Sequence, residues 1–63
     1  MNRKLIIFGT GGHAVSVANV ALSANYEIVG FVDLKKSGST LLGYPILGSC
    51  EAFGDPLDYF FAI

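Results

Sequence analysis

The chain has 63 residues, which suffice for one small domain that buries only about 60% of the surface of its unfolded form. Its hydrophobic fraction of 52% is high for this length, so we expect a partner or a further segment to cover part of its apolar surface. The net charge of −1 argues against nucleic acid as a partner, and the single cysteine excludes an internal disulfide or a cysteine-based zinc site.

The first predicted element is a strand over residues 5–8, an apolar run without polar alternation. Such a run is typical of a strand that is buried on both faces of a parallel sheet. Four apolar residues are too few for the hydrophobic region of a signal peptide, and no stretch approaches the roughly 20 residues that cross a membrane. We therefore expect a cytoplasmic protein that has no membrane partner.

A glycine-rich turn follows this strand directly. It consists of Gly9, Thr10, Gly11, Gly12, His13 and Ala14. The spacing fits G-x-G-x-x-A, in which Gly9 allows a sharp turn, Gly11 lets a ligand approach, and Ala14 lets a helix pack closely on the strand. Free N–H groups and the dipole at the start of the following helix favour an anion there. The turn is thus predicted to bind a phosphate, the alternative being a tight strand-to-helix turn without a ligand.

A helix with one broad, buried apolar face is predicted over residues 13–24. Its apolar positions are Ala14, Val15, Val17, Ala18, Ala21 and Leu22, and its polar positions Ser16, Asn19 and Ser23 lie on the other side. Asn25 is expected to end the helix in the left-handed conformation.

The second strand is predicted over residues 27–33, and Asp33 closes it. Asp33 lies 19 residues beyond Ala14, close to the roughly 20-residue spacing at which an acid meets a ribose hydroxyl. Such an acid disfavours a ribose 2′-phosphate. The two strands and the helix predict a right-handed βαβ unit.

The second half of the chain is more irregular. Residues 34–40 are expected to form a polar loop, and residues 43–48 an extended piece or edge strand. Ser49 is expected to cap a short helix over residues 50–53, which Gly54, Asp55 and Pro56 end. Residues 59–63 are predicted to form a third buried strand.

These elements predict an α/β fold with a small Rossmann-like parallel sheet, consisting of the βαβ unit plus the third strand, in one domain over residues 1–63. The strand order 2-1-3 and the order 3-2-1 both fit the pattern. Because the last strand coincides with the end of the chain, we expect a truncated or naturally incomplete unit.

Four segments together resemble a known family. They read KLIIFGTGGHAVSVANV, YEIVGFVD, GYPILGS and YFFAI. They are similar to the N-terminal nucleotide-sugar-binding domain of NeuD/PglD-type sugar O- or N-acetyltransferases, which act in the biosynthesis of sialic-acid-type or bacillosamine-type sugars. The resemblance implies a homotrimer in which this domain precedes a left-handed β-helix that carries the catalytic histidine and the acetyl-CoA site. It therefore implies no catalytic residue and no bound cofactor in this chain.

The resemblance also implies a binding site for a UDP-sugar or a related nucleotide-activated sugar. The residues expected around the diphosphate are Gly9, Thr10, Gly11, Gly12 and His13. Asp33 would face the nucleoside, the alternative being a solvated strand-end aspartate that caps the next loop. Lys35 either reaches a phosphate or is a solvated loop charge. His13 donates a hydrogen bond to a phosphate, is a polar residue of the first helical turn, or acts as a general base. The absence of a second histidine argues against the last role. No metal site is expected.

Two other hypotheses stay open at this point. The fingerprint and Asp33 alone would suit the first βαβ unit of an NAD-dependent oxidoreductase. The end of the chain at Ile63 would suit an inactive orphan fragment of a disrupted reading frame.

Overall fold

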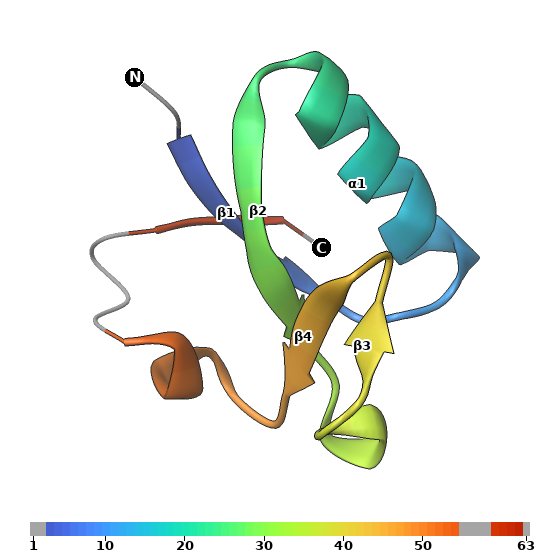
Figure 1. Ribbon diagram of the computed structural model, residues 1–63, viewed down its shortest axis with the longest axis vertical. Coiled ribbons are helices and arrows are strands. Elements are labelled where there is room, and N and C mark those ends of the chain that lie inside the picture. The colour runs from blue at the N-terminus through green and yellow to red at the C-terminus, as the bar shows by residue number, and fades with distance from the viewer. Residues whose placement is uncertain (1–2, 55–58, 63) are drawn as a thin grey trace.

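One sheet of five strands carries the fold in the computed structural model, which describes residues 3–54 and 59–62 (Figure 1). The elements in chain order are β1 (Arg3–Phe8), α1 (Gly12–Ser23), β2 (Tyr26–Val32), the 3₁₀ helix η1 (Leu34–Lys36), β3 (Thr40–Leu41), β4 (Tyr44–Leu47), the 3₁₀ helix η2 (Cys50–Phe53) and β5 (Phe60–Ala62). No helix among these residues is both long enough and apolar enough to span a bilayer.

The strands lie in the order β3-β4-β2-β1-β5. β4, β2, β1 and β5 pair in parallel, and only β3 runs antiparallel, against β4. The predicted α/β fold with a Rossmann-like parallel sheet is therefore confirmed. Because β5 pairs with β1 and not with β2, the three predicted strands have the order 2-1-3.

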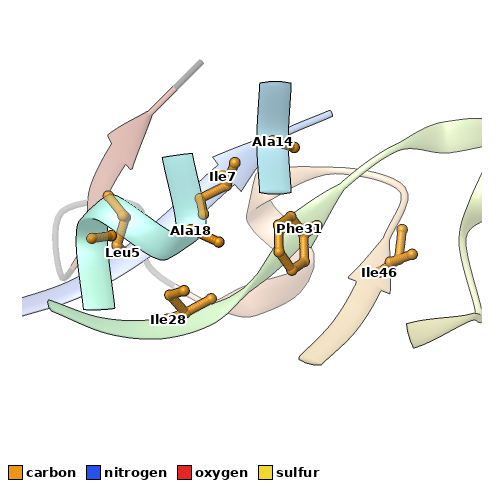
Figure 2. Packing of buried hydrophobic residues seen from close by; sticks show 8 residues of the cluster. Leu5, Ile7, Ala14, Ala18, Ile28, Phe31 and Ile46 are labelled. Atoms are coloured by element: carbon orange, nitrogen blue, oxygen red, sulfur yellow. The ribbon is translucent and has the colours of Figure 1, made fainter. Parts of the chain in front are cut away.

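The core lies between α1 and the sheet, where small helix residues meet large strand residues (Figure 2). Leu5 and Ile7 of β1 point to this face, and Ala14 and Ala18 bring the helix backbone close to them. Ile6 alternates to the opposite face and is also fully buried. The prediction that this strand is buried on both faces is thus confirmed.

A bulge in β2 adapts its side chains to this core. Leu5 lies opposite Ile28 and Ile6 lies opposite Gly30, so Val29 has no partner in β1. Beyond this extra residue, the side chains point to the opposite face from the one that regular alternation would give. Ile28 and Phe31, which are three positions apart, therefore both lie in the core beneath α1 (Figure 2).

The ends of α1 agree closely with the prediction. The helix begins one residue early, at Gly12, and Asn25 beyond its end has the expected positive φ of 65°. The expected burial of Leu22 is wrong, because its side chain is 44% exposed. The buried stripe follows Ala14, Ala18 and Ala21, and Leu22 lies about 100° around the helix from Ala21, outside that stripe.

Two expectations for residues 34–48 are corrected by the structure. The polar loop over residues 34–40 contains η1 and leads into β3. The extended piece over residues 43–48 contains β4, which is not an edge strand. β4 lies inside the sheet, since it pairs in parallel with β2 and antiparallel with β3. β3 therefore forms the edge on this side.

The short helix over residues 50–53 is present as η2, but the hydroxyl of Ser49 makes no capping hydrogen bond, contrary to expectation. Gly54 follows it with a φ of 116°, whereas Asp55 and Pro56 lie outside the described residues.

The third predicted strand is present as β5, but its expected burial is wrong for Phe60 and Phe61, which are 54% and 40% exposed. β5 lies at the edge of the sheet, where each ring has one aromatic neighbour. The centroid of Phe60 is 6.1 Å from that of Tyr26, and the centroid of Phe61 is 5.8 Å from that of Phe8. Ile63 lies outside the described residues.

We predict that Gly30→Ala destabilises the fold by about 1–3 kcal/mol, because an added methyl overpacks a full site. A Cβ at Gly30 would lie 2.6 Å from the Pro45 carbonyl oxygen and 2.6 Å from Cζ of Phe53. Chemical denaturation monitored by circular dichroism measures the loss. Gly12→Ala is the matched control, since a Cβ there has no neighbour within 4 Å. Equal stability of the two variants would contradict this account.

We predict that Leu42→Asn stabilises the fold by about 0.5–1 kcal/mol, because Asn tolerates the left-handed conformation better than Leu. Leu42 and Gly43 connect β3 to β4 with φ values of 54° and 84°, the positive pair of a type I′ turn. Leu42 is 51% exposed, so little burial is lost. Thermal unfolding measures the gain, and Leu42→Val should shift the midpoint downward. A lower midpoint for the Asn variant would show that the Leu42 contacts outweigh the turn strain.

Candidate functional site

The carboxyl ends of β1, β2 and β4 meet at one edge of the sheet. Phe8 lies opposite Val32, and one residue later the N–H of Gly9 donates to the carbonyl of Val32 at 2.8 Å. The N–H of Asp33 in turn donates to the carbonyl of Leu47 at 3.0 Å. The glycine turn and the strand-end acid, which are distant in sequence, therefore lie side by side.

The glycine turn leaves its outer surface open. Gly9 has a φ of 98°, which strongly favours glycine, and it redirects the chain from β1 toward α1. Gly11 precedes the helix in an extended conformation, with φ −81° and ψ −168°. A Cβ at Gly11 or Gly12 would have no neighbour within 4 Å, so another molecule can approach the backbone there.

The N-terminus of α1 carries no compensating negative charge from its own residues. Gly11 has no side chain to cap the helix, and residues 12–15 include no acid. The helix ladder begins with the bond from the N–H of Val15 to the carbonyl of Gly11 at 3.2 Å, so the N–H groups of residues 12–14 have no acceptor within the helix. This arrangement favours an anion in front of the turn.

Asp33 is held at both carboxylate oxygens. The Thr10 hydroxyl donates to Oδ2 at 2.6 Å, and the Lys35 N–H donates to Oδ1 at 3.0 Å. The bond from Thr10 is the main cause of a lowered pKa at Asp33. Partial desolvation opposes that shift, whereas the N–H groups of Lys35 and Lys36 and the charge of Lys36 reinforce it. Asp33 is therefore a carboxylate at neutral pH.

The two remaining predicted side chains, those of His13 and Lys35, lie at the surface. His13 is exposed in the first turn of α1, and Lys35 is exposed in η1. Lys35 contributes to the geometry through its backbone N–H. The contact between Thr10 and Asp33 is the feature that sequence analysis missed, because nothing in the local pattern joins residues 23 positions apart.

A hollow borders His13, on the side of α1 that faces β5. It is a groove of about 510 Å³ with mostly apolar walls. Its lining residues are Leu5, His13, Ser16, Val17, Val20, Ala21, Ala24, Tyr26, Phe60, Phe61 and Ala62. Among the seven predicted site residues, only His13 borders this groove. Val20, whose side chain is 69% exposed, belongs to the same open apolar surface.

The part of the chain that the structure describes contains no group of three or more His, Cys, Asp or Glu side chains placed to hold a metal ion. The candidate site offers backbone N–H groups for an anion at the glycine turn, and the Asp33 carboxylate lies beside this turn as a hydrogen-bond acceptor.

The sheet order, the glycine turn and the strand-end acid define a small Rossmann-like domain with a candidate anion site. The family model described as PglD N-terminal domain matches residues 4–63, and the chain belongs to this family. The resemblance to the N-terminal domain of NeuD/PglD-type acetyltransferases is thereby confirmed. No curated protein and no solved structure gives a match.

We predict that Thr10→Val lowers the thermal stability at pH 7 and that this deficit shrinks in acid. Folding lowers the pKa of Asp33 below its ordinary value of 3.8, mainly through Thr10. The carboxylate therefore stabilises the fold above about pH 4, and this contribution is lost as the pH falls through the lowered pKa. Melting midpoints at about pH 7 and about pH 2 measure the change.

Thr40→Val serves as the control for that comparison, because Thr40 is exposed in β3 and its side chain is remote from Asp33 in the pairing of the sheet. A deficit of Thr10→Val that stays constant across the two pH values would contradict the role of Thr10 in the pKa of Asp33.

Proposed function

We propose that this chain is the nucleotide-sugar-recognition domain of an acetyl-CoA-dependent sugar acetyltransferase. Membership of the PglD N-terminal domain family supports the acetyltransferase context. In this proposal the domain binds a UDP-sugar or a related nucleotide-activated sugar, and a separate left-handed β-helix binds acetyl-CoA and carries out acetyl transfer. The assembled enzyme is a cytoplasmic homotrimer.

The hydrogen bond from Thr10 to Asp33 is the observation that carries the binding proposal. It joins the glycine turn to the strand-end acid at 2.6 Å and makes one site of them. A nucleoside diphosphate presents both chemical groups that this site suits, because its phosphates are anionic and its ribose hydroxyls are hydrogen-bond donors. The geometry thus supports recognition of the nucleotide half of the substrate.

Each site residue has a defined task in this proposal. Gly11 and Gly12 let the diphosphate reach the N–H groups at the start of α1. His13, exposed in the same turn, donates an imidazole N–H to a phosphate oxygen. Asp33 accepts hydrogen bonds from the ribose, and Lys35 adds a positive charge at the rim. None of them performs chemistry, so the domain binds and orients the sugar for a reaction elsewhere.

We predict that Gly11→Asp abolishes binding of UDP-N-acetylglucosamine while the domain stays folded. An aspartate at this position repels the diphosphate and occupies its approach path. The N-cap preference for Asp and the helix dipole each favour the variant by about 0.3–1 kcal/mol, which offsets repulsion from Asp33. Calorimetric titration measures binding, and circular dichroism checks folding.

Asn25→Asp is the matched control, because it adds the same charge beyond the other end of α1, where Asn25 already has a positive φ that Asp tolerates. Wild type and Asn25→Asp should bind the UDP-sugar saturably. Parallel titration with NAD tests the oxidoreductase alternative, which binding of NAD alone would favour. A folded wild-type chain that binds neither ligand would overturn the proposed function.

A further inference from the structure

We infer that Thr10 is a positioning residue that holds the Asp33 carboxylate toward the 2′- and 3′-hydroxyls of the ligand's ribose and thereby selects ribonucleotides over 2′-deoxyribonucleotides. This inference rests on the proposed function and deepens it. It assigns Thr10 a role different from the diphosphate contact expected from the sequence.

The donor inventory of Thr10 supports this assignment. A threonine hydroxyl has a single O–H to donate, and Thr10 donates it to Oδ2 of Asp33 at 2.6 Å. The hydroxyl can then only accept a further hydrogen bond, which makes it a poor partner for a phosphate oxygen, itself an acceptor. In this inference the anion at the turn is bound by the backbone N–H groups at the start of α1.

The orientation of Asp33 is restrained from two directions. Thr10, in the turn after β1, holds Oδ2, and the N–H of Lys35, in η1, holds Oδ1 at 3.0 Å. Two bonds to different oxygens prevent the carboxylate from turning freely. The Thr10 bond is partly buried, which strengthens it relative to the exposed bond from Lys35.

The remaining acceptor capacity of Asp33 matches a vicinal diol. An ionised carboxylate offers about four lone-pair sites on its two oxygens. The Thr10 hydroxyl uses one site on Oδ2 and the Lys35 N–H uses one on Oδ1, whereas the Lys36 N–H, which also lowers the pKa of Asp33, donates to the main-chain carbonyl of Asp33 at 3.2 Å. One site therefore remains on each oxygen, and the two neighbouring hydroxyls of a ribose supply two donors. A 2′-deoxyribose supplies one, and a 2′-phosphate brings repulsion instead of a donor.

The test compares binding of UDP with binding of 2′-deoxy-UDP, by calorimetry, for wild type, Thr10→Val and Thr10→Ser. The wild type should prefer UDP by about tenfold or more, since a hydrogen bond to a charged group carries that much discrimination. Thr10→Val removes the donor with little change of shape, and its preference should fall to about threefold or less. Thr10→Ser keeps the hydroxyl and should restore most of the preference.

The possible failures are distinguishable from one another. An unchanged preference in Thr10→Val, or an equal loss of affinity for both ligands, would overturn the positioning role while the proposed function stands. A folded wild-type chain that binds neither UDP nor 2′-deoxy-UDP would overturn the proposed function and this inference with it. Thr10→Ala also removes the hydroxyl donor, so its preference decides the matter if Thr10→Val fails to fold.

Discussion

The parallel pairing of β1 with β2 and with β5 is the constraint on which the rest of this structure depends. A strand with parallel neighbours on both sides is covered on both faces, and the apolar run of β1 meets that demand. The pairing also places the ends of these strands together, so the turn after β1 adjoins the acid after β2. The direction of the chain connections reverses at β1, and in folds of this type ligands bind at such a point.

The proposed function requires few side chains at the candidate site, because the backbone would supply most of the contacts to a nucleotide. The proposed anion position lies at the glycine turn and the start of α1, where a Cβ at Gly11 or Gly12 would have no neighbour within 4 Å. The short hydrogen bond from Thr10 to Asp33 fixes an acceptor beside that position. Recognition and catalysis are separable in such an arrangement, because no pair of groups suited to proton transfer is needed at the binding site.

The features that sequence analysis predicted correctly depend on local patterns. The apolar run predicted β1, the glycine spacing predicted the turn that follows it, and the helix periodicity predicted α1. Each of these patterns lies within a few neighbouring residues. The hairpin at Leu42 and Gly43 was missed because Leu-Gly lacks the usual Asn-Gly signal of a type I′ turn. The exposure of Phe60 and the contact of Thr10 with Asp33 depend on which strands become neighbours, and composition does not reveal that.

The apolar groove between α1 and β5 has a consequence for the temperature dependence of folding. Val20, Phe60 and Phe61 keep much of their surface in water in the folded state. Surface that is hydrated in both states adds nothing to the heat-capacity change of unfolding, which for typical domains is about 12–15 cal/mol/K per residue. The domain should therefore have a smaller heat-capacity change than its apolar composition suggests, a flatter stability curve, and a weaker response to denaturant.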